Sequence, residues 1–121
     1  MMNEKYWLSR TELLLGREKL EKLKKSHILI AGLGGVGSYA AEAVCRAGVG
    51  KITIVDNDVV MASNRNRQLL ALISTDGRSK ISLMAERLKD INPDLELIVS
   101  EAYLKDESIP ELLNHSYDYV I

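Results

Sequence analysis

Residues 27–37 read HILIAGLGGVG, an apolar segment that runs directly into four closely spaced glycines. A strand that turns sharply into a helix needs backbone conformations and close approaches that a Cβ atom would forbid. We therefore interpret residues 27–31 as a strand and Gly32 as the turn residue. Gly34 then lets a phosphate approach the main chain, and Gly37 lets the following helix pack on the strand. The stretch predicts a strand, a phosphate-binding turn and a helix.

An acidic residue follows at the distance that such a site requires. A second apolar segment, residues 51–56, ends in Asp56, nineteen positions after Gly37. An acid at this place can accept a hydrogen bond from a ribose hydroxyl. The first turn of the helix after the glycines carries about half a positive charge and unpaired N–H groups, which favour an anion. Together these features predict a nucleotide site and leave the nucleotide open.

Strands and helices alternate along the whole sequence. Ser9 and Glu12 have the spacing of a capping box, so a helix is expected from about residue 10, with a pause at Gly16. The alternation predicts an α/β, Rossmann-like three-layer fold with a mainly parallel sheet, preceded by a helical arm over residues 1–25. We expect helices over 10–25, 37–47, 78–91 and 109–114, strands over 27–31, 51–56, 95–100 and 117–121, and an inward face of Leu20, Leu23, Ile81, Met84, Leu88 and Ile91.

The composition is that of a soluble globular domain. The 121 residues are 46% hydrophobic and 27% charged, which is enough to build one core. The sequence has no apolar run long enough to cross a bilayer and no signal peptide, so we expect a cytoplasmic protein without a membrane segment. A net charge of −1 gives no general attraction to nucleic acid.

Several reactive or charged side chains are expected to be structural. Cys45 lies on the small, apolar face of its helix, which favours a packed core thiol over a nucleophile. His27 and His115 form no metal-binding pattern. Arg65 and Arg78 are expected to be ordinary surface residues.

The loop after the second strand distinguishes between nucleotides, because it gathers polar and cationic side chains that a dehydrogenase does not need. Lys80 lies in the first turn of a helix, where a cation opposes the helix dipole at a cost of about 0.3–1 kcal/mol. Arg10 lies in the same unfavourable position in its own helix. Since such positions are often functional, we expect Arg10, Arg67 and Lys80 to converge on a polyphosphate whose charge grows as a bond to its α-phosphorus is exchanged.

These motifs resemble those of one enzyme superfamily. GLGGVGS, VDND, SNRNRQ and the helix start DGRSK, preceded by SRTELLLG, look like the ubiquitin-activating-like adenylyltransferases ThiF, MoeB and HesA. Within this superfamily the sequence is most similar to the tRNA threonylcarbamoyladenosine dehydratase branch, also called TcdA or CsdL. That likeness rests on SRTELLLG, GVGSYAAEA, NRQ followed by LLAL, and INPD.

The resemblance implies roles for individual residues. Asp56 would bind the ribose of ATP, and Arg10 would reach the active site of the partner subunit in a homodimer. Tyr103 falls near the expected place of the adenine. The metal-associated aspartate of the family would directly follow Ile121, so no metal ligand is assigned. Residues that would line, contact or orient the phosphates are Gly32, Gly34, Gly35, Gly37, Asn64, Arg67, Gln68 and Lys80, and the catalytic set would be Arg10, Asn64, Arg67 and Lys80.

The resemblance also implies a reaction. A carboxylate attacks the α-phosphate of ATP, with Mg²⁺ offsetting the developing charge, and gives an acyl-adenylate and pyrophosphate. In the dehydratase branch the carboxylate belongs to the threonylcarbamoyl group of a modified tRNA, which then cyclises with net loss of water. In the sister branches it is the C-terminus of a ubiquitin-like or sulfur-carrier protein. An NAD-dependent oxidoreductase and a non-catalytic nucleotide-binding or dimerisation module remain open as alternatives.

Two features qualify this interpretation. The last apolar run, residues 117–121, has no turn after it, so we expect residues 1–121 to be the N-terminal part of a single ATP-binding domain. The missing residues would then face the site, because ligands bind beyond the carboxyl ends of parallel strands. A basic stretch over residues 17–25 is a candidate contact for tRNA, and a solvated helix face explains it equally well.

Overall fold

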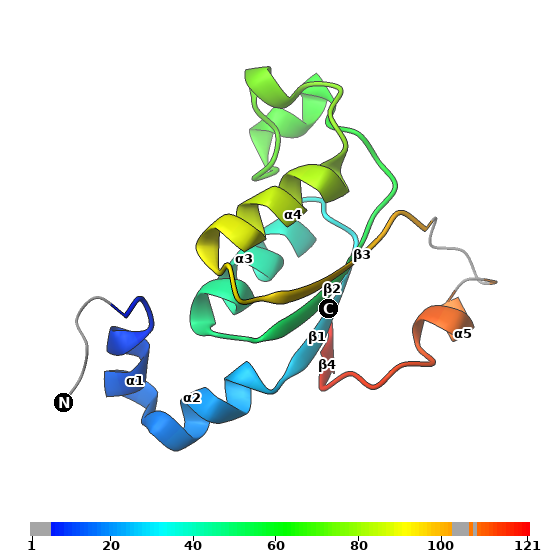
Figure 1. The fold of residues 1–121 in the computed structure, drawn as a ribbon. Helices are drawn as coiled ribbons and strands as arrows, with labels where there is room; N and C mark the ends of the chain where they lie inside the picture. Colours follow the sequence, from blue (N-terminus) through cyan, green and yellow to red (C-terminus); the bar gives the residue numbers. More distant parts are fainter. Residues whose placement is uncertain (1–5, 103–106, 108) are drawn as a thin grey trace.

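The computed structural model describes residues 6–102, 107 and 109–121. Helices and strands alternate along it (Figure 1), and the pattern confirms the predicted α/β class. The elements in chain order are α1 (Ser9–Leu15), α2 (Arg17–Lys24), β1 (His27–Ala31), α3 (Gly37–Ala47), β2 (Lys51–Val55), the 3-10 helices η1 (Ala62–Asn66) and η2 (Ile73–Thr75), α4 (Lys80–Ile91), β3 (Glu96–Ser100), α5 (Ile109–Leu112) and β4 (Tyr119–Val120).

The four strands form one parallel sheet in the order β3-β2-β1-β4. Ile28 of β1 lies beside Ile52 of β2, which in turn lies beside Leu97 of β3. In this register the apolar residues of neighbouring strands lie on the same face of the sheet, which is the arrangement that alternating helices and strands predict. The carboxyl ends of the strands therefore meet at one edge, where the glycine-rich turn follows β1.

The hydrophobic core lies between this sheet and the helices α3 and α4, which lie together on one of its faces (Figure 1). Ile30 and Ile54 of the sheet and Met84 and Leu88 of α4 have no exposed surface. The predicted inward face of α4 is confirmed, since Ile81 is buried and Ile91 is partly buried against the same cluster. In the part of the chain that is described, no helix is both long and apolar enough to cross a membrane.

The opposite face of the sheet is covered less completely, because a pocket lined by Thr53, Ile98 and Leu112 lies between this face and the short helix α5. His27 connects this region to the sheet: its Nδ1 lies 2.9 Å from the carbonyl oxygen of Ser116, and its Nε2 lies 2.7 Å from Oγ1 of Thr53. The ring also packs on Tyr117, with 4.6 Å between centroids. These contacts confirm a structural role for His27. The third layer of the predicted fold is thus represented, among the described residues, by α5.

The turn between β1 and α3 depends on two glycines. Gly32 adopts a φ of +97°, which L side chains rarely tolerate. A Cβ atom at Gly37 would lie 1.7 Å from the carbonyl oxygen of Gly32 and 3.5 Å from Cγ2 of Ile30. Gly37 therefore allows the turn to close on itself, in addition to the predicted packing against the strand. At the far end of α3, Gly48 has a φ of +107° and ends the helix as expected.

Some element boundaries differ from those that the sequence predicts. Helix α1 begins with Leu8 at its N-cap and without a side-chain capping bond, so the predicted capping box of Ser9 and Glu12 is not formed. Leu8 is 3% exposed, and its packing fixes the start of the helix instead. Helix α4 begins at Lys80 rather than near residue 78, because Oγ of Ser79 accepts the N–H of Ser82 and caps the helix. Helix α5 and strand β4 are shorter than predicted.

Replacing Gly37 with alanine should destabilise the fold, because the added Cβ would meet a backbone oxygen that has no room to move away. We expect Gly37→Ala to lose about 1–3 kcal/mol of unfolding free energy, measured as a lower urea midpoint. Gly35→Ala is the matched control: its Cβ would lie 3.8 Å from Cγ of Arg67, so the midpoint should barely change. Equal midpoints for the two variants would contradict the assigned role of Gly37.

Because the thiol of Cys45 is buried, we expect the free energy of unfolding to change with pH in the alkaline range. Burial raises its pKa from an ordinary 9.0 to about 11, so between these values the unfolded chain has lost a proton that the folded chain retains. The free energy of unfolding should therefore fall as the pH rises from about 9 to 11, by up to about 2–3 kcal/mol. Urea unfolding at several pH values measures this slope. The Cys45→Ala variant should show a shallower slope, and identical slopes would disprove the contribution.

Candidate functional site

The glycine-rich turn presents backbone groups at the carboxyl edge of the sheet. Helix α3 begins directly after it and has no acidic residue in its first turn. The positive end of the helix is therefore not neutralised from within the helix, which suits an anion. A Cβ atom at Gly34 would find Nε2 of Gln68 at 3.7 Å, and one at Gly35 would find Cγ of Arg67 at 3.8 Å. The structure thus brings Gln68 and Arg67 to the glycines, as predicted from the sequence.

Asp56 joins the glycine-rich turn to the end of β2. It is 9% exposed, and its Oδ2 accepts the N–H of Leu33 at 2.7 Å. Its Oδ1 accepts the N–H of Asp58 at 2.6 Å. A carboxylate offers about four acceptor positions, so these two bonds leave capacity for a ribose hydroxyl. The residue lies beside the turn, where the predicted ribose contact requires it.

Asn64 shapes the loop that carries the cations. Its side chain is buried, and Oδ1 accepts the N–H of Met61 at 3.0 Å. Its carbonyl oxygen accepts the N–H groups of Arg67 and Gln68 at 3.1 and 2.9 Å. These bonds are internal to the loop, so the two roles that the family resemblance implies for Asn64, contact with phosphates or their orientation, stay predictions. Asn64 holds the short helix η1 in the form that presents Arg67 and Gln68.

Arg67 is exposed at the end of η1. Its Nη1 donates to the carbonyl oxygen of Ser63 at 3.3 Å and to Oδ1 of Asn66 at 2.9 Å. Both acceptors belong to η1, and within the described part of the chain no carboxylate pairs with this guanidinium. A guanidinium carries five N–H donors, and the contacts to Ser63 and Asn66 occupy only part of them. The arrangement leaves Arg67 able to bind phosphate oxygens.

Lys80 reaches the same region through a small backbone pairing. Its N–H donates to the carbonyl oxygen of Asp58 at 3.1 Å, and Val59 forms an antiparallel bridge with Ser79. Lys80 as a whole residue is 6% exposed. Within residues 6–102, 107 and 109–121, its Nζ has neither a hydrogen-bond acceptor nor a carboxylate within 4.0 Å. The stem of Lys80 is thus largely covered while its ammonium stays available, so an anion bound at this place would be attracted to it.

Arg10 lies elsewhere in the chain. It is exposed on α1, and α1 packs at the amino end of the sheet, where a Cβ atom at Gly48 would lie 3.4 Å from Cδ1 of Leu8 (Figure 1). The length of β2, about 15 Å for five residues, separates this end from the glycine-rich turn. The structure therefore does not bring Arg10 to Arg67 and Lys80 within one chain. Its role in the site of a partner subunit stays a prediction.

The remaining assignments have different outcomes. Arg65 and Arg78 form exposed ion pairs with Asp76 at 3.2 Å and Glu86 at 3.5 Å, which agrees with their prediction as surface residues. Tyr103 lies outside the described residues. The sequence did not single out Asp58, which connects Asp56 to Lys80 through its backbone N–H and carbonyl. No side-chain pattern signals such a role, because any residue type supplies these groups.

Sequence comparison identifies close relatives. Residues 8–121 match the ThiF family. The chain is 49% identical over 113 residues to tRNA threonylcarbamoyladenosine dehydratase of Bacillus subtilis (strain 168), covering 93% of this chain and 44% of the relative. It is 40% identical over 111 residues to the protein of the same name from Escherichia coli (strain K12), covering 92% and 41%. Molybdopterin-synthase adenylyltransferase of E. coli (strain K12) is 39% identical over 93 residues, covering 77% and 37%.

Solved structures give the same result. The crystal structure of E. coli tRNA N6-threonylcarbamoyladenosine dehydratase, TcdA, in complex with ATP superimposes with a TM-score of 0.92 at 35% identity, covering 99% of this chain and 50% of that chain. The chain thus spans half or less of the length of these relatives. The glycine-rich turn, the acid after β2 and the cationic loop occur here in one structure that a family match covers almost completely, and the chain belongs to the ThiF family.

Proposed function

We propose that the protein containing this chain is an ATP-dependent enzyme that activates a carboxylate by adenylation. The observation that carries the proposal is that Lys80 and Arg67, neither of them paired with a carboxylate among the described residues, lie at the same edge of the sheet as the glycine-rich turn. Such a site favours a polyphosphate, since each of these features lowers the free energy of a bound anion. The similarity to an enzyme solved with ATP supports the same nucleotide.

Different residues of the chain would bind different parts of ATP. The N–H groups at the start of α3 would bind the phosphates, and Asp56 would accept from the ribose. Arg67 and Lys80 would stabilise the charge that grows on the phosphates when a carboxylate oxygen attacks the α-phosphorus and pyrophosphate leaves. Mg²⁺ would add to this stabilisation, held mainly by phosphate oxygens as is usual for this ion.

The substrate that we propose is the threonylcarbamoyl group of a modified tRNA. Its carboxylate would become an acyl-adenylate, and internal attack would then close a ring and release AMP, so that the tRNA loses water overall. The relatives named tRNA threonylcarbamoyladenosine dehydratase support this choice, because the one from B. subtilis is 49% identical and the molybdopterin-synthase adenylyltransferase of E. coli is 39% identical. The C-terminus of a sulfur-carrier protein is the second candidate.

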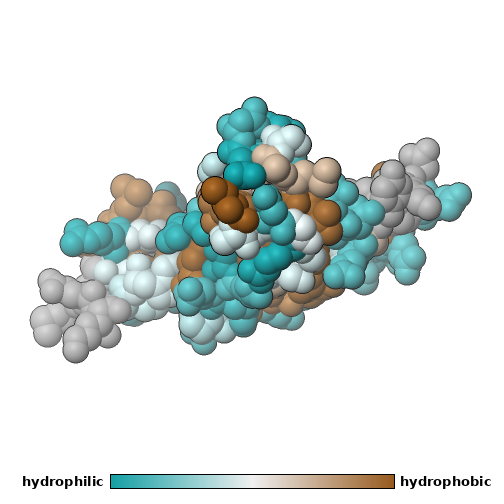
Figure 2. Space-filling model, turned by 90° about the horizontal axis from the view of Figure 1, so that it is seen from above, coloured by the Kyte–Doolittle hydropathy of each residue, from teal (hydrophilic) through white to brown (hydrophobic). Residues whose placement is uncertain are grey.

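We also propose a cytoplasmic homodimer in which Arg10 enters the site of the partner subunit. Helix α1 exposes Leu13 and Leu14 at 69% and 83% of their surface, and Leu72 and Ile73 at η2 are exposed at 54% and 79%. Seen from above, apolar side chains stand among polar ones over the central part of the molecule (Figure 2). Contact between α1 of one chain and the loop of another would cover such side chains and supply the third cation to the phosphates.

The function is tested by the release of pyrophosphate from ATP by the full-length protein. We expect release with tRNA that carries threonylcarbamoyladenosine, and none with the same tRNA lacking the modification, because only the former offers the carboxylate. Release with a small carrier protein ending in Gly-Gly, and not with modified tRNA, would assign the protein to the second candidate. Absence of pyrophosphate release with both substrates would reject adenylation.

Removing either cation from the site should slow adenylation much more than it affects folding. Lys80→Met keeps most of the buried stem and removes the charge, and Arg67→Ala removes the guanidinium. Each should lower the rate of pyrophosphate release about a hundredfold or more, with little change in melting temperature. Arg65→Ala is the matched control, since Arg65 lies on the same short helix and pairs with Asp76 on the surface. A rate loss in the control as large as that of Arg67→Ala would contradict the assignment.

A further inference from the structure

Positive charge is concentrated on the helical arm. Residues 17–25 hold five cationic and two acidic side chains, in a chain whose net charge is −1. The segment therefore carries +3 while the remainder is acidic. Leu20 faces inward and is 2% exposed. The helical periodicity then places Lys19, Lys22 and Lys25 on the outward side of α2, and all of them are exposed.

Among the described residues, which begin at Tyr6, the side chains of these three lysines form no hydrogen bond or ion pair. Arg17 pairs with Glu12, and Lys24 pairs with Glu21, both at 3.5 Å. In the described ranges, with their gaps at 103–106 and 108, no carboxylate lies within 4.0 Å of Nζ in Lys19, Lys22 or Lys25. A run of unpaired lysines on one face of a helix is complementary to the evenly spaced charges of a nucleic-acid backbone.

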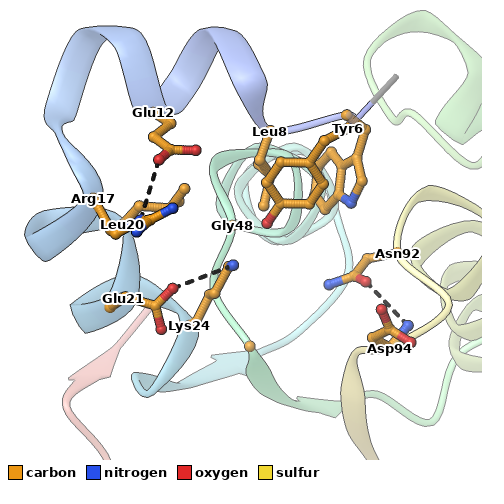
Figure 3. Close-up of a pocket in the computed structure, with 12 residues that line it drawn as sticks. Tyr6, Leu8, Glu12, Arg17, Leu20, Glu21, Lys24, Gly48, Asn92 and Asp94 are labelled. Atoms are coloured by element: carbon orange, nitrogen blue, oxygen red, sulfur yellow. Dashed lines mark hydrogen bonds and ion pairs between the residues drawn. The ribbon is translucent and has the colours of Figure 1, made fainter. Parts of the chain in front are cut away.

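A cavity of about 760 Å³ borders the same helix (Figure 3). It lies between the two arm helices on one side and the turn of Asn92 and Asp94 on the other, with Gly48 between them. Its size is within the range of ligand pockets. On the arm side of the cavity, the carboxylates of Glu12 and Glu21 are paired with Arg17 and Lys24. Because these charges balance one another, the cavity suits a ligand group that carries no compact charge of its own.

Aromatic side chains line this cavity, which lies on the side of α2 that carries Leu20, away from the three outward lysines. Trp7 is 42% exposed, and the ring of Tyr6 lies 5.1 Å from Nζ of Lys24. Unpaired bases stack on such rings, and the amide of Asn92 and the carboxylate of Asp94 are groups that can hydrogen-bond to base edges. The lysines and the rings lie on different sides of the same short helix, so an unpaired stretch of RNA that passes around α2 could place phosphates on the lysines and a base on the rings.

We propose that the α1 and α2 arm is an RNA-binding surface, on which Lys19, Lys22 and Lys25 contact phosphates and the cavity at Trp7 receives an unpaired base. The inference rests on the proposed tRNA substrate and locates part of its contact. In one chain the arm is distant from the ATP site. Gly16 alone separates α1 from α2, and α2 spans about 12 Å. If Arg10 of one chain reached the site of its partner, the lysines on the same arm would therefore also lie near the partner's site.

The lysine contacts are tested by the salt dependence of tRNA binding to the full-length protein. The triple variant Lys19→Ala, Lys22→Ala and Lys25→Ala should remain folded, because alanine favours helix. We expect its Kd for an unmodified tRNA transcript to rise at least about tenfold at moderate salt, and the slope of log K against log salt to fall by about two. The control is Arg46→Ala with Arg87→Ala, two exposed cations that pair with Glu42 on the helix-covered side.

The base contact is tested by fluorescence of Trp7, whose share of the emission of the full-length protein is the part that disappears in Trp7→Phe. Titration with the tRNA transcript should quench part of the emission, and Trp7→Phe should lose that part while it keeps the affinity, since phenylalanine also stacks. Trp7→Ala should bind about tenfold more weakly. An unchanged Kd in Trp7→Ala and in the triple lysine variant, or equal weakening in the arginine control, would overturn the proposal.

These outcomes are separate from those of the proposed function. If modified tRNA still drives pyrophosphate release but the arm variants bind tRNA as tightly as the unchanged protein, only the RNA-binding surface is rejected. If the arm binds tRNA as expected but modified tRNA drives no pyrophosphate release, the proposed substrate is rejected and the surface remains.

Discussion

The carboxylate of Asp56 is the interaction on which the candidate site depends. One oxygen binds the N–H of Leu33 in the glycine-rich turn, and the other binds the N–H of Asp58 after β2. The carbonyl of Asp58 then accepts the N–H of Lys80 at the start of α4. Three segments that are distant in the sequence are thus linked by hydrogen bonds that begin at one side chain. The charge assisting the first two bonds makes them stronger than neutral ones.

The same chain of bonds explains how the largely buried side chain of Lys80 is held at the start of α4. The helix dipole disfavours its charge, so local preferences alone do not explain a lysine at the start of α4. The pairing of the segment around Val59 with Ser79 fixes the start of α4, and the N-cap of Ser79 holds the first turn. Stability provided by these backbone contacts offsets the cost of a cation in the first turn of a helix, and a bound polyphosphate would be attracted to the same cation.

Much of this arrangement could be predicted from the sequence, because it depends on local rules. The spaced glycines predict a turn, and the apolar periodicity of α4 predicts a face buried in the core. The acid after β2 predicts a nucleotide site near the turn. Gln68 and Arg67 lie near Gly34 and Gly35, which agrees with the shared phosphate site that the family resemblance implies for these residues. What could not be predicted depends on long-range packing. Arg10 appeared equivalent to the other cations by its helix position, but Leu8 anchors α1 at the opposite end of the sheet.

The capping box of Ser9 failed for the same reason. A cap contributes about 1 kcal/mol, and full burial of a leucine contributes about 1.5–3 kcal/mol, so the packing of Leu8 on Gly48 and Leu20 determines where α1 begins. This packing also decides what the arm can do. It holds the arm at the amino ends of the strands, while the glycine-rich turn lies at their carboxyl ends. A reaction that needs Arg10 and Lys80 at the same phosphates therefore requires two chains, and each chain would provide the nucleotide site for one reaction and the arm for the other.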